Sequence, residues 1–469
     1  MKMSGKKVIV FIVLAAAVAL AYQLPYLRYN FYQQMMDGLA LTDLQIGLIG
    51  SAVSLTSTLC YPIGGVLADK VNCKTLIVIT FASFTLLSVW FAFAQGFIQL
   101  MIIHILFAFF GIATLWSAYL TAVRGLADEK SQSKIFGWNE GTRGIIQFLT
   151  SLAIVALMAV ALNVVAPNGG YADSAALQVA AETDPTALAL FSEGSANGFR
   201  YVMLFAAGVC AIFTILAVIF MDGKKKQAAD AAASAEPVVE QKKYTVGEVL
   251  KNPGVWIVML LIMFAYLFWT IGNSYLTQYT TDVLGLDSGT ASTIGTVRTY
   301  LIVAVAGFLG GIVLDKFPYK GRSFVVLLVV DTVLVIVVML TGSQLALCVA
   351  ITICISFISN IMKTTYWSTM GDAGIPAAMT PLATGIISFI AFIPDWIYPT
   401  VFGGMLDSAR AADGGVAGAA VQGTYMTIFV ILIISGIIGM IIAFILWKRT
   451  LKLEAAGEIE IDHGKKAKA

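Results

Sequence analysis

Long apolar runs, broken by short polar stretches, extend along this chain of 469 residues. About 20 apolar residues in a helix cross the hydrocarbon core of a bilayer. The runs and their breakers predict twelve membrane-spanning helices, with boundaries good to about two to four residues. They are expected at residues 8–32, 44–67, 75–95, 98–123, 137–165, 198–221, 253–281, 290–314, 323–342, 344–368, 380–406 and 422–447. The predicted fold is therefore an all-α membrane protein.

Composition supports this class. Hydrophobic residues make up 59% of the chain and charged residues 12%, and the mean hydropathy is +0.87. The first apolar run follows Lys2, Lys6 and Lys7 as a signal peptide would, but it lacks a small-residue cleavage site and is predicted to stay as the first span. The net charge of +2, without a basic patch, argues against a nucleic-acid partner.

Basic residues mark one side of the predicted membrane. They fall in alternate loops or at the tail, at Lys70, Lys74, Lys130, Lys134, Lys224, Lys225, Lys226, Lys242, Lys243, Lys316, Lys320, Arg322, Lys448 and Arg449. The loop at 166–197 instead carries four acidic residues and is predicted to face outward. By the positive-inside rule both termini are cytoplasmic, in a multi-pass protein of the plasma membrane, with the bacterial inner membrane favoured.

The cysteines and histidines do not indicate a metal or a cofactor. The five cysteines, which have no disulfide or metal-site spacing and are read as packing residues, are Cys60, Cys73, Cys210, Cys348 and Cys354. His104, in the fourth span, has no second ligand at metal-site spacing. No standard short catalytic motif occurs, so an enzyme is not predicted.

A charged segment divides the chain. Residues 223–251 are rich in Lys and Ala, with interspersed Glu and Asp, and join six spans to six others. The predicted organisation is an N-terminal six-helix bundle at 1–222, a cytoplasmic linker at 223–251, a C-terminal six-helix bundle at 252–449 and a cytoplasmic tail at 450–469.

The loops after the second and eighth spans repeat one pattern. The first reads Gly-Gly-Val-Leu-Ala-Asp-Lys at 64–70, and the second reads Gly-Gly-Ile-Val-Leu-Asp-Lys at 310–316. Glycines let a neighbouring helix approach closely, and the aspartate can meet a helix N-terminus or an arginine such as Arg124. A role in gating is therefore predicted for a set of five residues, namely Asp69, Lys70, Arg124, Asp315 and Lys316.

Both loops resemble the signature loop of the major facilitator superfamily. Asn72 stands where the superfamily has its second glycine, and Asn accepts left-handed backbone geometry. Cys73 stands where a basic residue is usual. The resemblance implies two six-helix bundles that rock about a midplane site, so that substrate binding drives alternating access.

Within the superfamily, the chain resembles the organophosphate:phosphate antiporter branch. The likeness rests on Tyr-Leu-Arg-Tyr-Asn-Phe at 26–31, Leu-Thr-Asp-Leu-Gln-Ile-Gly at 41–47 and Trp138-Asn139. It implies that Arg28 is one of two phosphate-binding arginines. The second arginine of that branch belongs to the seventh span, where this chain reads Tyr-Leu-Phe-Trp-Thr at 266–270. The branch's histidine after Trp138-Asn139 is absent.

Three cations inside apolar segments are candidate anion ligands. A permanent charge is costly there and usually functional, and the arginine fork suits carboxylate, sulfonate or phosphate oxygens. Arg28 lies in the first span and Arg298 in the eighth, where the alternative is a pair with Asp282. Lys363 lies in the tenth span and either binds the anion or pairs with Asp395.

Several acidic residues have more than one reading. Asp395 follows Pro394 in the eleventh span, where it either carries a coupling proton or forms a structural or gating ion pair. Glu140 and Arg143 are also candidates for coupling or gating, and they are three residues apart, the spacing of an intrahelical pair. Asp331, in the ninth span, is expected to be structural.

Aromatic and amide side chains beside these cations are predicted to contact a polar organic substrate. The residues predicted to bind it together with the three cations are Tyr26, Trp138, Asn139, Tyr266, Trp269 and Asn273. Tyr22, Trp116 and Tyr119 belong to the same aromatic group, part of which serves packing or the membrane interface.

These patterns predict a secondary active transporter that moves a small organic anion, of the sugar phosphate, sugar acid or sulfonate type, across the cytoplasmic membrane by alternating access. A proton or an inorganic anion is expected as the coupled species, and the protein as a monomer. One alternative is a proton-coupled or facilitative carrier of neutral sugars or amphipathic drugs. Another is a transport-like sensor that binds a ligand without net flux.

Overall fold

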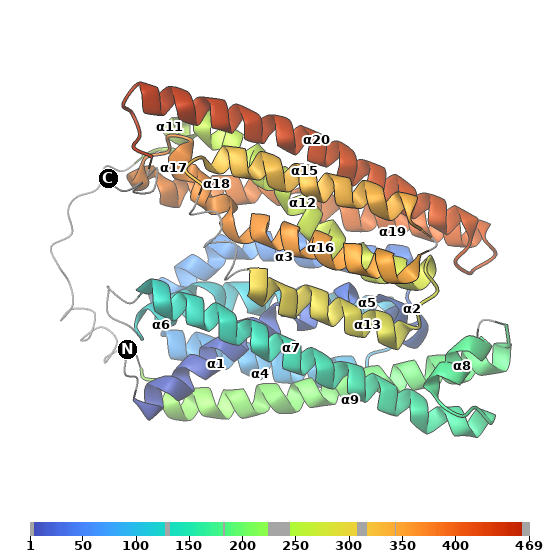
Figure 1. Ribbon diagram of the computed structural model, residues 1–469. Coiled ribbons are helices and arrows are strands. Elements are labelled where there is room, and N and C mark those ends of the chain that lie inside the picture. The colour runs from blue at the N-terminus through green and yellow to red at the C-terminus, as the bar shows by residue number, and fades with distance from the viewer. Residues whose placement is uncertain are drawn as a thin grey trace, which may run out of the picture. The chain divides into compact units, whose positions relative to one another are not determined.

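Helices form every regular element that the structure describes (Figure 1). The computed structural model describes residues 4–126, 132–181, 183–223, 244–306, 317–342 and 344–461. The predicted all-α fold is confirmed for these residues.

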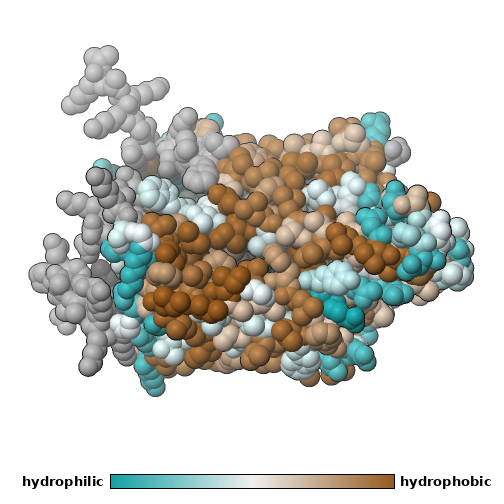
Figure 2. All heavy atoms as spheres, turned by 90° about the horizontal axis from the view of Figure 1, so that it is seen from below, coloured by the Kyte–Doolittle hydropathy of each residue, from teal (hydrophilic) through white to brown (hydrophobic). Residues whose placement is uncertain are grey.

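Ten helices in the described residues are long and apolar enough to cross a membrane. They are Asp43–Ala68, Cys73–Ala92, Gly96–Arg124, Gly137–Gly169, Pro185–Phe220, Pro253–Asp282, Lys320–Leu340, Leu345–Asp372, Leu382–Ala412 and Ala419–Ala455. Figure 2 shows one face of the molecule, on which apolar side chains occupy the middle and polar side chains gather towards the two ends. A lipid environment accounts for this pattern, because hydrocarbon favours apolar side chains.

The other two predicted spans have interrupted helices. The run at 8–32 is not one continuous helix, as the prediction had it, but three separate elements. The run at 290–314 begins as an α-helix and passes through a π-helical turn, and its residues 307–314 lie outside the described residues.

The first compact unit comprises Met1–Pro237, Leu286–Tyr300 and Tyr398–Asp407. Its elements are α1 (Gly5–Ala21), η1 (Leu24–Tyr29), α2 (Tyr32–Leu39), α3 (Asp43–Lys70), α4 (Cys73–Ala92), α5 (Gly96–Phe109), η2 (Phe110–Thr114), α6 (Trp116–Arg124), α7 (Gln132–Val165), η4 (Ala166–Gly169), α8 (Ser174–Ala181), α9 (Pro185–Phe220) and α13 (Ser288–Thr296). Helix α9 packs against α4, α7, α2 and α1. An ion pair of 2.7 Å between Lys6 Nζ and Asp222 Oδ1 joins the start of α1 to the segment after α9.

The second compact unit comprises Val238–Gly285, Leu301–Ile397 and Ser408–Ala469. Its elements are α11 (Val246–Lys251), α12 (Pro253–Asp282), α15 (Lys320–Leu340), α16 (Leu345–Thr365), η6 (Tyr366–Ser368), α17 (Thr369–Asp372), η7 (Ala377–Met379), α18 (Thr380–Ala391) and α20 (Ala419–Ala455). Two elements contribute to both units, η5 (Val297–Leu301) and α19 (Pro394–Ala412). Helices α15 and α20 run side by side, and α12 packs against α16, α18 and α20 (Figure 1).

The division into two bundles joined by a linker stays a prediction. Residues 224–243, which form most of the predicted linker at 223–251, lie outside the described residues, as do Lys130, Lys224 and Lys242 among the topology markers. Helix α20 continues to Ala455, six residues into the predicted tail at 450–469.

Side-chain caps fix several helix starts. Thr42 and Gln45 form a reciprocal capping box at the start of α3, in which the Gln45 amide nitrogen donates to Thr42 Oγ1 and the Thr42 amide nitrogen donates to Gln45 Oε1. Asn252 Oδ1 accepts from the Gly254 amide, and Pro253 occupies the first turn of α12. These signals explain why the predicted starts at 44 and 253 agree with the structure.

Helix α9 begins 13 residues before the predicted start at 198. The loop predicted at 166–197 instead holds η4, α8 and the first turns of α9. Asp184 accepts from the Thr186 amide at 2.8 Å, and Pro185 follows it at the first helical position. An Asp-Pro pair is a recognised helix start, whereas the prediction followed hydropathy and waited for the apolar stretch.

The Asp184 cap should give the protein a measurable pH dependence. The backbone hydrogen bond from Thr186 holds the pKa of the Asp184 carboxyl below its usual value. The ionised carboxyl therefore stabilises the fold above the unfolded-state pKa of about 3.9, and this contribution is lost as pH falls through the lower folded-state pKa. Asp184→Ala is expected to lower the melting temperature at pH 7, and its difference from wild type should shrink at pH 3.

Thermal unfolding in detergent at the two pH values measures this effect. Glu193→Ala, which removes an exposed acid from the same helix, is the matched control and should change neither melting temperature. A difference for Asp184→Ala that is as large at pH 3 as at pH 7 would contradict the ionised-cap explanation.

Candidate functional site

Arg28 lies on a break in the first predicted span. Helix α1 ends at Ala21, and Pro25, which lacks an N–H, lies in the first turn of the short 3-10 helix η1. Tyr26 has a non-helical backbone, with φ −115° and ψ 22°. Gln23 Nε2 donates to the Gln147 carbonyl oxygen at 3.1 Å and to Ser151 Oγ at 2.7 Å, which ties the break to α7. The prediction of a continuous helix was wrong here because this tie comes from residues more than 120 positions away.

The Arg28 side chain is buried in a tight seat. It is 3% exposed, and its guanidinium carbon lies 4.8 Å from the centroid of the Tyr29 ring. On α3, a Cβ atom added at Gly50 would lie 2.8 Å from Arg28 Nε. The guanidinium therefore occupies space that only glycine leaves open. Sequence reasoning missed Gly50, because nothing in the sequence pairs positions 28 and 50.

Arg298 lies on a second helix break in the same unit. It is fully buried within η5, a π-helical turn that follows α13. The Asn30 side-chain amide and the Thr299 hydroxyl form a hydrogen bond of 3.0 Å, and the Asn30 amide nitrogen faces the Gly295 carbonyl oxygen at 3.2 Å. These bonds join η1 to the turn that carries Arg298. Two predicted cations thus flank one contact, Arg28 two residues before Asn30 and Arg298 one residue before Thr299.

The predicted residues of α7 have differing environments. Asn139 is fully buried, where its Oδ1 accepts from Tyr119 at 2.7 Å and its Nδ2 donates to the Phe11 carbonyl oxygen at 3.4 Å. Trp138 is 50% exposed. Glu140 and Arg143 form the intrahelical pair that their spacing predicted, with 2.6 Å between Glu140 Oε2 and Arg143 Nη2. Asn139 therefore connects three helices of unit 1.

Unit 2 brings five predicted residues together along α12. Lys363 Nζ lies 3.1 Å from the centroid of the Trp269 ring, a close cation–π contact. Asp395 accepts from the Tyr266 hydroxyl at 2.8 Å and from Thr270 Oγ1 at 2.9 Å.

The remaining contacts of this group lie within α12. The Tyr266 and Trp269 rings are 5.4 Å apart, and Asn273 Nδ2 donates to the Trp269 carbonyl oxygen at 2.9 Å. A cation and a carboxylate therefore contact the same two turns of α12. Thr270, which sequence reasoning did not select, supplies one of the two hydroxyls on Asp395.

The eleventh predicted span divides into two helices before Pro394. Helix α18 stops at Ala391, and Pro394 and Asp395 form the first turn of α19. The amide nitrogens of a first turn lack partners within their helix, and a carboxylate at this position is stabilised by the helix dipole.

Asp282 pairs with Arg410, whereas the sequence suggested a pair with Arg298. Its Oδ2 forms an ion pair of 3.0 Å with Arg410 Nη2 and accepts from Tyr425 at 2.8 Å. Gln278 Nε2 donates to Oδ1 at 3.0 Å. Arg410 follows Asp282 by 128 positions, which is why the sequence did not reveal the pair.

Neither His104 nor the cysteines were predicted to bind a metal. His104 is buried, with Nδ1 2.8 Å from the Leu100 carbonyl oxygen, and packs against Phe91 and Phe107. The five cysteines are free thiols. Within the described residues, no group of three His, Cys, Asp or Glu side chains could hold a metal ion.

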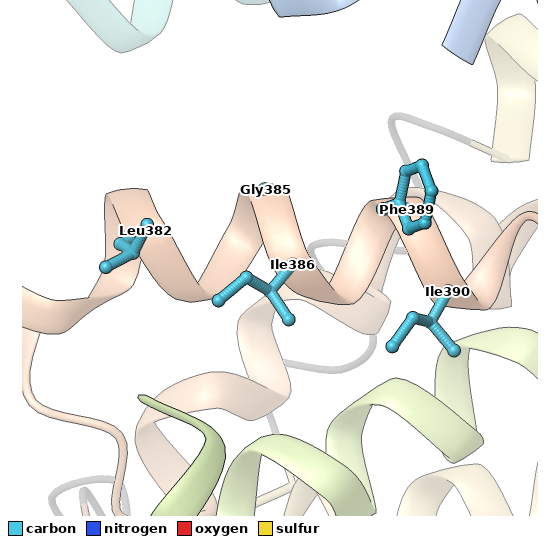
Figure 3. A pocket seen from close by; sticks show the side chains of 5 residues that line it. All are labelled: Leu382, Gly385, Ile386, Phe389 and Ile390. Carbon is cyan, nitrogen blue, oxygen red and sulfur yellow. The ribbon is translucent and has the colours of Figure 1, made fainter. Parts of the chain in front are cut away.

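Two hollows lie away from the predicted substrate residues. One, of about 290 Å³, is lined by five residues of α18 and carries no charged group (Figure 3); these are Leu382, Gly385, Ile386, Phe389 and Ile390. A smaller one of about 70 Å³ lies within unit 1 and is lined in part by Gln34, Gln178 and Ser288.

Comparison with known proteins identifies the family. Residues 8–395 match the Major Facilitator Superfamily, which is most of the chain. The chain belongs to the major facilitator superfamily.

Relatives and solved structures agree with this membership. The inner membrane protein YqcE of Escherichia coli K12 is 25% identical over 416 residues, covering 87% of this chain and 90% of YqcE. The inner membrane protein YihN of the same organism is 21% identical, covering 95% and 97%.

Two solved structures share the fold. One is a bacterial homologue of the human lysosomal transporter Spinster, crystallised inward-facing and occupied, with a TM-score of 0.72 at 16% identity, covering 96% of this chain and 99% of that one. The other is the nucleoside transporter NupG, with a TM-score of 0.65 at 13% identity, covering 95% and 99%.

Membership decides the broad function. The protein is a multi-pass inner-membrane transporter that binds small-molecule substrates, and it is not an enzyme. The predicted fold class and the prediction of a transporter are confirmed. Substrate, coupling and orientation of the termini stay predictions.

The superfamily's signature loop has a helical start in this transporter. Helix α3 continues through Lys70, so residues 64–70 are helical and only Val71 and Asn72 separate α3 from α4. A Cβ atom added at Gly64 would lie 2.9 Å from the Ile112 carbonyl oxygen of η2, which agrees with the predicted close helix approach. Asn72 does not use left-handed geometry, as its φ of −61° shows. Asn72 instead caps α4, and its Oδ1 accepts from the Lys74 amide at 2.9 Å.

The predicted gating residues of these loops are only partly described. The backbone of Asp69 lies within α3, but its side chain is outside the described part of the structure, as are Asp315 and Lys316 entirely. Lys70 ends α3, and Arg124 ends α6 with an exposed side chain. Their gating roles stay predictions.

Proposed function

We propose that this transporter is a secondary active carrier of a small organic anion, of the sugar phosphate, sugar acid or sulfonate type, working by alternating access. The observation that carries the proposal is the pair of arginines buried at two helix breaks of unit 1, which the bond between Asn30 and Thr299 joins. Burying a permanent charge in a membrane protein is costly, so such residues usually serve a ligand. The guanidinium fork matches the oxygens of carboxylate, sulfonate and phosphate groups.

Helix breaks favour this role for Arg28 and Arg298. Irregular backbone within a membrane protein is tolerated where it lines a polar region or is buried in protein, and discontinuous helices often carry the sites of transporters. Each arginine lies in such a stretch, one in a 3-10 helix and one in a π-helical turn.

Lys363 is a further candidate anion ligand, which lies in unit 2. Its contact with Trp269 holds the ammonium over an aromatic face, and a cation–π contact keeps the charge available to an anion. The likeness of residues 26–31 to the organophosphate:phosphate antiporter branch supports an anionic substrate. Trp269 and its neighbours stand where that branch has its second arginine, so the anion need not be a phosphate ester.

Counterflow into proteoliposomes tests the substrate class. Proteoliposomes that contain the purified protein are loaded in turn with glucose 6-phosphate, glucuronate, cyclohexanesulfonate and neutral glucose. Uptake of the matching labelled solute is then measured. At least one anion should exchange well above the level of glucose. Exchange of glucose alone would favour the neutral-solute carrier, and binding of an anion without exchange would favour a sensor.

Asp395 is the candidate carrier of a coupling proton. It lies in the first turn of α19 and accepts from two hydroxyls of α12, so its protonation would change two interhelical bonds at once. Asp395→Asn removes the proton site but keeps a side chain of similar shape. We expect this variant to lose accumulation driven by a pH gradient while keeping at least about half of the wild-type counterflow, because exchange needs no net proton movement.

Accumulation with and without an imposed pH gradient measures the effect. Asp173→Asn, at an exposed acid of unit 1, is the control and should accumulate substrate like wild type. Gradient-driven accumulation that survives in Asp395→Asn would rule out proton carriage by this residue.

A further inference from the structure

A chain of aromatic rings runs through unit 1 from Arg28 towards Arg143. We define the aromatic strip as Tyr29, Tyr26, Tyr22, Trp116, Tyr61 and Tyr119. Ring centroids are 5.5 Å apart for Tyr26 and Tyr29, 6.3 Å for Tyr22 and Tyr26, 5.7 Å for Tyr22 and Trp116, 6.3 Å for Tyr61 and Trp116, and 5.9 Å for Trp116 and Tyr119. Arg28 lies over Tyr29 at one end, and the guanidinium carbon of Arg143 lies 6.0 Å from the Tyr22 ring in the middle of the strip.

The rings of the strip differ in burial. Tyr29 and Tyr119 are buried at 7% and 1% exposure, whereas Tyr61 is 39% exposed and Tyr22 and Trp116 are half-buried. Tyr29 and Tyr119 anchor the strip, and Tyr61, Tyr22 and Trp116 keep open surface. Packing within unit 1 therefore does not use all of the aromatic area.

A charged pair lies beside the open rings of the strip. The Glu140 side chain is 47% exposed inside the candidate span Gly137–Gly169, and a charged group at that position avoids hydrocarbon. Glu140 Oε1 accepts from Tyr119, a strip residue, at 3.4 Å, and its partner Arg143 contacts Tyr22. The Tyr22 and Tyr61 hydroxyls also lie 3.4 Å apart on this surface.

We propose that the aromatic strip is a stacking subsite for a ring of the substrate, so the transported anion is cyclic. The inference rests on the proposed anion function: Arg28 would hold the anionic group while the strip beside it accepts a pyranose or aryl ring. Ring faces supply apolar contact, and the tyrosine hydroxyls supply hydrogen bonds to ring substituents. Trp116, which contacts three other rings of the strip, would be the specificity-determining residue.

Matched pairs of cyclic and acyclic anions test the proposal. The pairs are glucuronate and gluconate, glucose 6-phosphate and sorbitol 6-phosphate, and cyclohexanesulfonate and hexanesulfonate. Binding to purified protein in detergent is measured as the ligand-induced rise in melting temperature over a concentration series. We expect the cyclic member of at least one pair to bind roughly 3- to 10-fold more tightly, the range that aromatic stacking contributes.

Variants separate stacking from charge recognition. Trp116→Leu should bring cyclic binding down to the acyclic level, and Trp116→Phe, which keeps a ring, should retain part of the preference. Arg28→Lys should weaken both members of a pair and leave their ratio unchanged. Trp90→Leu, at an exposed tryptophan of α4 in the same unit, is the matched control and should bind like wild type.

Three outcomes overturn the proposal. Equal binding of both members in every pair would reject stacking while leaving the anion function standing. A cyclic preference that survives undiminished in folded Trp116→Leu would reject the aromatic strip as its source. Failure of all six anions to bind would reject both the anion function and the subsite.

Discussion

Replacing Arg28 by lysine is expected to reduce anion uptake by at least about tenfold, although the positive charge remains. Charge-assisted hydrogen bonds contribute about 1.5–3 kcal/mol each, and lysine cannot reproduce the two parallel donors of a guanidinium. The side chain is 3% exposed in the seat formed by Tyr29 and Gly50, so an ammonium on a flexible stem would not be held in the same position. Arg28→Ala should abolish uptake.

Uptake is measured in proteoliposomes, and thermal unfolding shows that each variant is folded. The matched control is Arg200→Lys, an exposed arginine of the same unit that contacts Phe93. Undiminished uptake by both Arg28 variants would contradict the anion role of this residue.

A Gly50 variant tests the anion role of Arg28 independently. A Cβ at this position would lie 2.8 Å from Arg28 Nε and 2.9 Å from Cζ, and the end of an arginine side chain can move aside. Gly50→Ala should therefore displace the guanidinium and reduce uptake without lowering the melting temperature. Uptake at the wild-type level would mean that the exact seat of Arg28 does not matter.

Gly47→Val is expected to destabilise the protein by about 1–3 kcal/mol or more, the range for overpacking. A Cβ at Gly47 would collide with the Pro399 carbonyl oxygen, and one at Gly403 would collide with the Asp43 carbonyl oxygen. Both obstacles are backbone atoms, which a rotamer change cannot move away. The valine should therefore separate α3 from the segment at 398–407 within unit 1.

Polar bonds would be lost with this close packing. The Asp43 amide donates to Asp407 Oδ1 at 2.8 Å, and Thr400 Oγ1 donates to Ser51 Oγ at 2.8 Å. The Asp407 carboxylate thereby meets the start of α3, where the helix dipole favours a negative charge. If α3 and the segment at 398–407 separate, these groups lose their hydrogen-bond partners.

The melting temperature in detergent measures the effect of Gly47→Val. Gly65→Val is the matched control, since Gly65 lies on the same helix and an added Cβ there meets nothing within 4 Å. The control should unfold close to the wild-type temperature. An equal loss for both variants would mean that valine disturbs α3 itself and not its contact with residues 398–407.

Hydropathy and helix-capping chemistry predicted much of this fold. Ten described helices coincide with predicted spans. The eleventh span was predicted as one run at 380–406, and its division into two helices before Pro394 was not predicted, although proline disturbs a helix. The break after Ala21 was not expected, since it depends on Gln23 reaching Gln147 and Ser151. The early start of α9 was missed although Asp184 and Pro185 mark it.

The candidate site was predictable by residue type but not by neighbourhood. Arg28, Arg298 and Lys363 are conspicuous because charges are rare in apolar segments. Their neighbours come from distant positions, such as Gly50 for Arg28 and Thr299 for Asn30, and a glycine that makes room carries no chemical signature. Sequence patterns report local preference, whereas these contacts depend on which helices meet.

Unit 1 is built from segments that lie far apart in the chain, and this has a consequence for biogenesis. Its last segment, Tyr398–Asp407, follows most of unit 2 in the chain, yet it supplies the carboxylate at the start of α3. Ribosomes add about 5–20 residues per second, so the early helices wait roughly fifteen to seventy seconds in the membrane before this partner is synthesised. During that interval the backbone amides at the start of α3 and the surface around Gly47 lack their final contacts. Unit 1 is therefore completed only near the end of translation. Its correct packing depends on a segment that a truncated chain would not contain.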